Sequence, residues 1–137
     1  MVARGEGKTL ITGSIAGHLP GAFHAVYNGS KAFIDSFAAA IGNEIKDSGV
    51  TITCLKPGAT ETKFFHRAEM DDTKVGQSKK ADPADTARTG WEAMLKGEHA
   101  VVDGLANKAQ VLAAGVLSES VTAEMHRKQA EPGSGKD

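Results

Sequence analysis

Three short runs of strand-forming residues alternate with helical patterns along this chain, and this alternation limits the fold more than any other feature. Apolar and β-branched residues dominate 8–12, 50–55 and 100–102, as is typical of strands. Residues 25–46 place apolar side chains at steps of three and four, the spacing of a buried helix. Strands that alternate with helices pair in parallel through right-handed crossovers. The sequence therefore predicts an α/β fold with a parallel sheet.

The stretch after the second predicted strand combines a long connection with a well-bounded helix. Residues 59–80 form a connection of a length that is usually functional in a compact domain. Asp82 is the expected N-cap of the next helix, Pro83 its first residue and Gly97 its C-terminal stop. The side chains that we expect this helix to bury, with the tryptophan as the core anchor, are Ala84, Ala87, Trp91 and Met94.

The end of the chain favours one more helix, followed by a polar tail. Residues 108–129 have helical propensity, and their apolar face is expected to include Leu112, Val116 and Val121. The glycine-rich residues 132–137 are predicted to be disordered.

Composition excludes several classes of function. The formal net charge is -1, which gives no general attraction to nucleic acid or to an anionic membrane. The single cysteine, Cys54, cannot form an internal disulfide, and no Cys/His spacing resembles a metal site. We therefore expect no bound metal and a reducing, cytoplasmic location. Residues 9–30 carry no charge, but their glycines and Pro20 argue against an integral membrane segment.

Ser14, Tyr27 and Lys31 form the most informative group of polar residues. Tyr27 and Lys31 lie four residues apart in the first predicted helix, so their side chains share one face. Ser14 follows the first predicted strand, thirteen residues before Tyr27. Ligands bind at the carboxyl ends of parallel strands, where these three side chains can converge.

The chemistry of these three groups is that of proton transfer. A phenol ordinarily releases its proton near pH ~10, and a neighbouring ammonium stabilises the phenolate. Tyr27 could then give a proton to a carbonyl oxygen or remove one from an alcohol. Ser14 could hydrogen-bond the same oxygen and stabilise its developing charge. A helix with a half-buried tyrosine and a snorkelling lysine shows the same spacing without any catalytic role.

The wider context resembles a known family. The stretch 9–31, TLITGSIAGHLPGAFHAVYNGSK, is similar to the catalytic segment of short-chain dehydrogenases/reductases, and 32–62 resembles their next helix, strand and Pro-Gly turn. The likeness extends over about residues 4–110. It implies a partial Rossmann-like three-layer fold in which 1–110 form the C-terminal half of the catalytic domain. Residues 111–131 would then be a C-terminal amphipathic helical segment.

The resemblance also implies an activity and a site. It implies hydride transfer between NAD or NADP and a small-molecule carbonyl or alcohol substrate, with Ser14, Tyr27 and Lys31 as the catalytic residues. Only the nicotinamide end of the cofactor would bind to this chain. The residues that match the family's cofactor-binding positions are Tyr27, Lys31, Pro57, Gly58, Thr60 and Thr62. Thr60 stands where a branched aliphatic residue is commoner.

The family's first half, with its glycine-rich phosphate-binding turn, has no counterpart in this sequence. The opening residues 1–8 resemble an internal stretch of a longer member, as an internal methionine or a truncated gene would produce. A competing interpretation takes 12–17, TGSIAG, as that glycine-rich turn. Leu19 occupies its last glycine position, and Pro20 and Gly21 interrupt the helix that should follow. This second interpretation is therefore disfavoured.

Two other functional interpretations are open at this point. The chain could be an inert remnant that acts as an interaction or oligomerisation module, docking through Phe33, Phe37 and the C-terminal helix. The mixed charges of 124–128 make a membrane-surface role for that helix the weaker choice. In either case, an uncovered strand edge and a broad apolar helix surface predict a homo-oligomer.

Overall fold

A three-stranded parallel sheet lies at the centre of the computed structural model, which describes residues 1–136. Strand β1 (Gly7–Thr12) pairs with β2 (Val50–Lys56), and β2 pairs with β3 (Ala100–Val102). The register places Ile11 opposite Cys54. The predicted parallel sheet, with strands that alternate with helices along the chain, is therefore confirmed.

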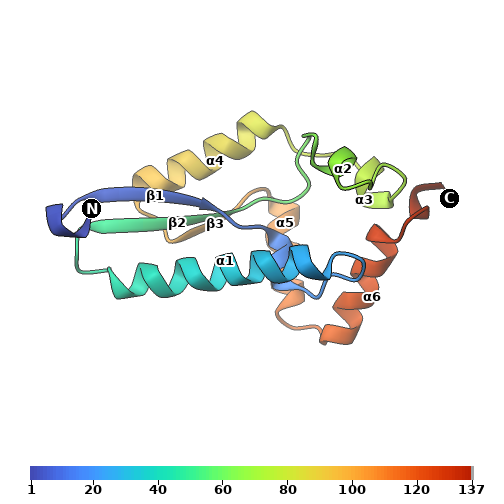
Figure 1. Ribbon diagram of the computed structural model, residues 1–137, viewed down its shortest axis with the longest axis horizontal. Coiled ribbons are helices and arrows are strands. Elements are labelled where there is room, and N and C mark those ends of the chain that lie inside the picture. Colours follow the sequence, from blue (N-terminus) through green and yellow to red (C-terminus); the bar gives the residue numbers. More distant parts are fainter. Residues whose placement is uncertain (137) are drawn as a thin grey trace.

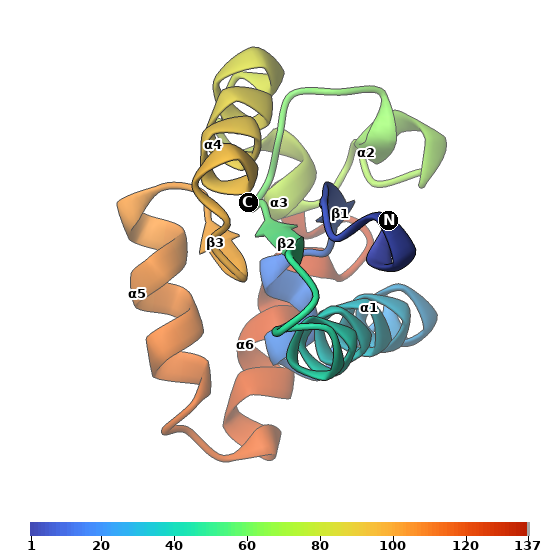
Figure 2. The same ribbon diagram turned by 90° about the vertical axis from the view of Figure 1, so that its left-hand side faces the viewer.

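Helices cover both faces of this sheet. Helix α1 (Ala25–Glu44) lies along one face and α4 (Pro83–Lys96) along the other (Figure 1). Ile52 and Cys54 of β2 pack against Ala38 of α1 to form the core of that layer. Seen along the strands, the sheet is enclosed between α1 and α4, which gives the three-layer α/β fold that the sequence predicts (Figure 2).

The ends of α4 agree with the prediction, but its buried face does not. The Asp82 side chain accepts a hydrogen bond from the Ala84 amide at 2.7 Å, and Gly97 ends the helix in a left-handed conformation with φ 74°. Trp91, the expected core anchor, is 56% exposed. The expected stripe was Ala84, Ala87, Trp91 and Met94, whereas the residues that α4 buries are Thr86, Gly90, Ala93 and Met94.

Hydrogen bonds to Asp103 explain why this stripe is displaced. The hydroxyls of Thr86 and Thr89 donate to the two carboxylate oxygens of Asp103, at 2.7 and 2.9 Å. These bonds set the rotation of α4 about its own axis and turn the threonine face inward. Hydrophobic periodicity alone could not reveal this orientation, because the decisive contacts are polar and join residues far apart in the sequence.

The C-terminal region also differs from the prediction. In place of one helix over 108–129, the chain forms α5 (Leu105–Ala114) and α6 (Glu119–Ala130), separated by a turn at Gly115. The predicted apolar face is not buried: Leu112 and Val116 are 74% and 84% exposed. After α6 the chain returns to the rest of the fold, because the Lys74 amide donates to the Ser134 hydroxyl at 3.0 Å.

Most of the remaining short elements gather at the carboxyl ends of the strands, whereas η1 lies at the other end, before β1. Within the predicted connection are the one-turn helices α2 (Phe64–Arg67) and α3 (Lys74–Gln77). The 3-10 turns are η1 (Val2–Arg4), η2 (Ile15–His18) and η3 (Ser134–Lys136). The turn η3 lies in the tail predicted to be disordered, of which residue 137 is outside the described residues. Elements η2, α2, α3, α5 and α6 all lie toward the end of the molecule to which the strands point (Figure 1).

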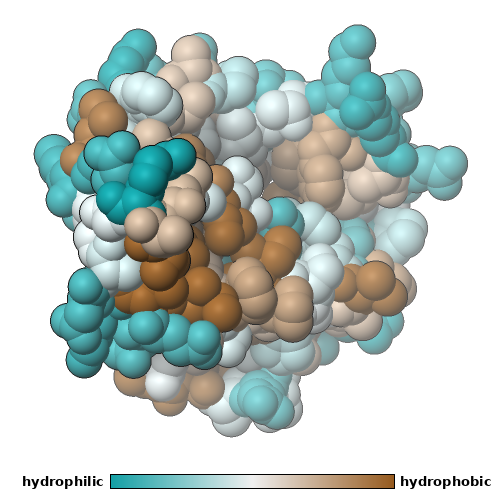
Figure 3. Space-filling view, turned by 60° about the vertical axis from the view of Figure 1, so that its left-hand side comes forward, coloured by the Kyte–Doolittle hydropathy of each residue, from teal (hydrophilic) through white to brown (hydrophobic). Residues whose placement is uncertain are grey.

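A large share of the apolar surface has no cover within residues 1–136. Phe33 and Phe37 of α1 stack at 5.8 Å between ring centroids and are 66% and 46% exposed. Figure 3 shows one broad area in which apolar side chains gather on the visible surface. Within the described residues, no helix is long and apolar enough to span a bilayer. Strand β1 pairs with β2 on one side only, so its other edge is also uncovered in this part of the chain.

Two helical glycines should respond in opposite directions to replacement by alanine. A Cβ at Gly90 would lie 2.7 Å from Leu55 Cδ2, whereas one at Gly29 meets nothing within 4 Å. Overpacking costs about 1–3 kcal/mol, and alanine gains up to about 1 kcal/mol over glycine in a helix. We expect Gly90→Ala to lower, and Gly29→Ala to raise, the free energy of unfolding measured in urea. Equal shifts would contradict this packing of α4.

Candidate active site

A cavity of about 1000 Å³ opens where the strands end. It is bounded by η2, α1, the connection that contains α2 and α3, and the C-terminal helices. The residues that sequence analysis singled out for catalysis or cofactor binding all line it: Ser14, Tyr27, Lys31, Pro57, Gly58, Thr60 and Thr62. The structure thus brings all seven together, from three separate stretches of the chain.

Ser14 is held by the turn that it begins. Its extended backbone, with φ -169° and ψ 154°, makes it the N-cap of η2, and its Oγ accepts a hydrogen bond from the Ala16 amide at 3.1 Å. The hydroxyl in turn faces the Pro57 carbonyl at a long 3.5 Å. Only 6% of the residue is exposed. The Ser14 proton therefore has a weak partner that a stronger acceptor in the cavity could replace.

Tyr27 and Lys31 lie side by side on α1. The Lys31 ammonium is 5.8 Å from the centroid of the Tyr27 ring and donates to the Thr12 carbonyl, at the end of β1, at 3.0 Å. The Tyr27 ring also packs against Phe64 of α2, with 5.2 Å between centroids. The phenol ring is thus held beside a positive charge by the spacing of Tyr27 and Lys31 on α1, by the bond from Lys31 to the end of β1, and by the contact with Phe64.

The turn after β2 forms another part of the cavity wall. The Ile15 amide donates to the Pro57 carbonyl at 3.1 Å and joins this turn to η2. The Thr60 hydroxyl donates to the Gly58 carbonyl at 3.1 Å, and the Thr62 hydroxyl accepts from the Phe64 amide at 3.2 Å. Both threonine side chains therefore shape the turn in addition to lining the cavity.

Asn107 is a cavity residue that sequence reasoning missed. Its amide nitrogen donates to the Asp103 carbonyl at 2.6 Å, which fixes the side chain against the turn after β2. A Cβ at Gly58 would lie 2.4 Å from this amide group. Gly58 is therefore required for the close approach of α5 to this turn. A lone asparagine after a predicted strand gave no sequence signal for this contact.

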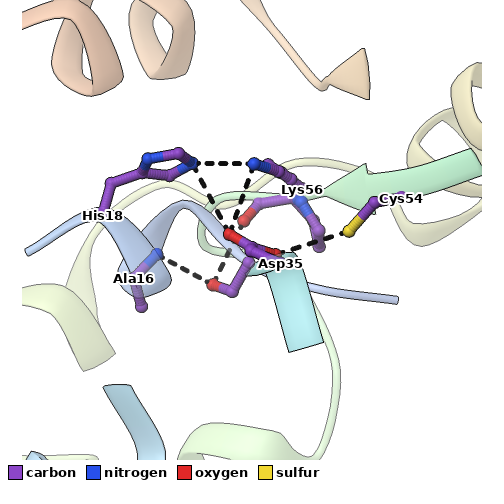
Figure 4. Close-up of polar contacts among 7 residues, drawn as sticks. Ala16, His18, Asp35, Cys54 and Lys56 are labelled. Atoms are coloured by element: carbon purple, nitrogen blue, oxygen red, sulfur yellow. Dashed lines mark hydrogen bonds and ion pairs between the residues drawn. The ribbon is translucent and has the colours of Figure 1, made fainter. Parts of the chain in front are cut away.

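A cluster of polar side chains beneath η2, centred on the Asp35 carboxylate, was also missed (Figure 4). The Asp35 side chain is 9% exposed, and its Oδ2 lies 3.4 Å from Lys56 Nζ and 3.5 Å from His18 Nε2. Its Oδ1 accepts a contact from Cys54 Sγ at 3.4 Å. Burial, reinforced by this carboxylate, raises the pKa of the Cys54 thiol to about 11. The sequence feature that could have revealed this cluster is the charge of Asp35, which interrupts the apolar face of a helix.

The Asp35 cluster connects the three segments that carry the predicted catalytic and cofactor-binding residues. Asp35 lies one turn after Lys31 on α1, His18 ends the η2 turn that follows Ser14, and Lys56 directly precedes Pro57. The backbone of the Ser14 turn lies directly on the carboxylate, because a Cβ at Gly17 would be only 2.8 Å from Asp35 Oδ2. This arrangement holds the three segments in fixed positions relative to one another.

The lowered pKa values of three histidines lead us to expect that the folded chain loses stability in mild acid. Burial lowers the pKa of His18, His24 and His126 in the folded chain, with Lys56 as a further cause at His18. The unfolded chain therefore binds protons first as the pH falls below the ordinary histidine value of about 6.5. Stability is fully present above that pH and decreases below it.

We expect the melting temperature to fall between about pH 7.5 and about pH 5.5. The variant His126→Gln should show a smaller fall over the same interval, because it removes one of the three histidines whose pKa is lowered in the folded chain. Calorimetry at the two pH values measures both effects. A melting temperature that rises on acidification would contradict the burial of these rings.

Comparison with known proteins gives a consistent result. A sequence model of the short chain dehydrogenase family matches residues 1–73. The chain belongs to this family. The matched residues include Ser14, Tyr27, Lys31 and the whole of the turn after β2. Within residues 1–136, no group of three or more His, Cys, Asp or Glu side chains is arranged so that it could hold a metal ion.

Two proteins that are similar to part of this chain are reductases by name. Elsinochrome reductase 1 of Elsinoe fawcettii is 27% identical over 86 residues, which cover 62% of this chain and 32% of that protein. Sulfoacetaldehyde reductase of Chromohalobacter salexigens is 43% identical over 61 residues, or 44% of this chain and 24% of that protein.

A solved structure shows the same fold. A short-chain dehydrogenase from Sphingobium yanoikuyae, in complex with NADPH, superposes with a TM-score of 0.67 at 22% identity, over 83% of this chain and 44% of that one. The matched regions thus span about a third or less of these two curated relatives, and less than half of this dehydrogenase.

Proposed function

We propose that this chain carries the proton-transfer and nicotinamide-binding part of an NAD(P)-dependent oxidoreductase that acts on a carbonyl or alcohol. The observation that carries the proposal is the convergence of Ser14, Tyr27 and Lys31 on one cavity, with the Lys31 ammonium beside the Tyr27 ring. Membership of the short chain dehydrogenase family and the reductase activities named for its relatives support it.

Each of the three side chains has a distinct part in this chemistry. Tyr27 Oη donates its proton to the carbonyl oxygen of the substrate as that carbonyl is reduced, and takes a proton back when an alcohol is oxidised. Lys31 stabilises the phenolate that remains. Ser14 Oγ exchanges its weak bond to Pro57 for a hydrogen bond to the substrate oxygen and stabilises the charge that develops there.

The residues around the Pro57 turn fit the nicotinamide end of the cofactor. Ile15 and Pro57 supply apolar surface at the cavity wall, and the hydroxyls of Thr60 and Thr62 lie within the same wall. The absence of a side chain at Gly58 keeps the turn close to Asn107. We assign Pro57, Gly58, Thr60 and Thr62 to this end of the cofactor, together with Tyr27 and Lys31. The bound dinucleotide supplies or accepts the hydride.

Cofactor binding and turnover test this proposal directly. The purified 137-residue chain is titrated with NADPH and with NADH, and the fluorescence of the reduced nicotinamide is followed. Turnover is then measured as the loss of nicotinamide absorbance on adding an aldehyde or ketone. We expect saturable binding and carbonyl-dependent oxidation of at least one of the two cofactors. Binding of neither cofactor would overturn the proposal for this chain.

A second candidate function is that of an oligomerisation module, and the exposed Phe33–Phe37 pair favours it. An enzyme of this fold can also associate through such a surface, so we expect a homo-oligomer in either case. Sedimentation analysis of Phe33→Glu should show a shift toward monomer. Self-association without any nicotinamide binding would favour the module; nicotinamide binding with carbonyl reduction would favour the enzyme.

A further inference from the structure

The cavity extends well beyond the three proposed catalytic side chains, and most of the additional wall is apolar. The connection after β2 contributes Phe65, Met70 and Val75. The C-terminal helices and the turn between them contribute Ala113, Leu117 and Met125. The volume of about 1000 Å³ is at the upper end of the range for small-molecule sites. The nicotinamide end of a cofactor would fill only part of it.

The charges around this cavity all have one sign. The chain contains 17 aspartate and glutamate residues, but none of those in the described residues 1–136 lines the cavity. The basic groups that do so are Lys31, Lys128, His24 and His126. Burial lowers the pKa of both histidines, which favours their neutral form. A cationic ligand would find no counter-charge in this wall, whereas a neutral or anionic one would meet no repulsion.

Helix α6 is fixed in place as one side of this cavity. His126 Nδ1 lies 3.0 Å from the Ala22 carbonyl, and its ring meets that of His24 edge-on at 5.3 Å between centroids. Arg127 of the same helix stacks over Phe23, with 5.2 Å from the guanidinium carbon to the ring centroid. These contacts attach α6 to the loop that leads into α1 and Tyr27. The apolar wall is thus placed in a fixed relation to the proton donor.

We propose that the Tyr27 site takes a carbonyl compound with an extended apolar body and no positive charge, and that α6 is the element that selects it. The apolar body lies between Phe65 of the connection and Met125 of α6, with its carbonyl directed to Tyr27. This inference rests on the proposed function for the identity of the reacting group. The apolar site itself can be tested without any cofactor or turnover.

A fluorescent fatty acid tests the site. cis-Parinaric acid becomes fluorescent when its polyene tail enters an apolar environment. We expect a saturable rise in its emission when the protein is added. Uncharged dodecanol should displace the probe, whereas dodecylammonium at the same concentration should not. Displacement by both to the same extent would overturn the exclusion of positive charge.

Two residues one turn apart on α6 provide a matched pair of variants. Met125 lines the cavity and Val121 does not, although their exposures are similar at 52% and 45%. Met125→Glu places a carboxylate in the apolar wall and should weaken probe binding by at least about tenfold. Val121→Glu should leave it unchanged, which controls for binding to the exposed surface. Equal effects of the two variants would overturn the assignment of this wall.

The outcomes separate this inference from the proposed function. Probe binding that depends on Met125, without turnover of any carbonyl, would support the apolar site and contradict the catalytic proposal. Reduction of a small polar aldehyde such as glyceraldehyde, without probe binding, would support the catalytic proposal and overturn the inference. If the catalytic proposal and the apolar site are both correct, kcat/KM should rise with the length of the aldehyde from butanal to decanal. Met125→Glu should abolish that rise.

Discussion

Replacing Tyr27 with phenylalanine is expected to lower the rate of carbonyl reduction by about 10²–10⁴-fold, the usual contribution of a positioned acid. The phenol is the acidic group that lies beside the Lys31 ammonium, and phenylalanine retains the ring that packs against Phe64 at 5.2 Å. The cavity should therefore keep its shape while it loses its proposed proton donor. Single-turnover measurements with saturating reduced cofactor report the chemical step without interference from product release.

Cofactor binding distinguishes the loss of a proton donor from the loss of the site. The fluorescence titration with reduced cofactor should give nearly the same Kd for Tyr27→Phe as for the parent chain. Lys31→Met should impair both turnover and binding, because its ammonium also fixes the end of β1 through the Thr12 carbonyl. An unchanged rate in Tyr27→Phe would remove Tyr27 from the mechanism. An unchanged rate in Lys31→Met would remove the ammonium.

The sequence predicted the elements of this fold well, because local chemistry defines them. The ends of α4 follow from Asp82, Pro83 and Gly97, whose side-chain and backbone preferences act over a few residues. The stretch 9–31 likewise contains its own strand, turn and helix, so all three proposed catalytic residues could be found from one segment. Their convergence on a single cavity follows from the parallel pairing of β1 with β2.

The parts that could not be predicted depend on contacts between distant residues. The rotation of α4 follows from Thr86 and Thr89 bonding to Asp103, and apolar periodicity carries no information about such bonds. The wall formed by α6 depends on His126 meeting Ala22, 104 residues earlier in the chain. The break between α5 and α6 occurs at Gly115, which helical propensity averaged over twenty residues does not reveal.

The Asp35 cluster is a further case in which the role of a residue depends on tertiary contacts that the sequence does not reveal. On the sequence, Asp35 is one acidic residue in a long helix, whereas in the structure it faces Lys56, His18 and Cys54. Its Oδ2 is within ion-pair range of two basic groups but makes no hydrogen bond of good geometry. We infer that charge, more than directional bonding, holds this carboxylate in place.

Removal of this carboxylate should therefore produce a large loss of stability. Breaking a buried ion pair by deleting one partner typically costs about 3–5 kcal/mol, because the other charge stays buried without compensation. The Lys56 side chain, 14% exposed, would be that charge in Asp35→Ala. This loss is a large part of the about 5–15 kcal/mol that stabilises a typical domain. Urea unfolding followed by circular dichroism measures it.

A double variant tests whether the loss comes from the uncompensated charge or from the cavity that alanine leaves. Asp35→Leu with Lys56→Met removes both charges and keeps apolar volume, so it should unfold at a higher urea concentration than Asp35→Leu alone. The coupling between the two substitutions, obtained from the complete cycle with Lys56→Met, isolates the pair. Additive effects would show that Asp35 stabilises the chain by some route other than Lys56. Strong coupling would identify the pair as a contact that joins α1, which carries the proposed proton donor Tyr27, to the Pro57 turn.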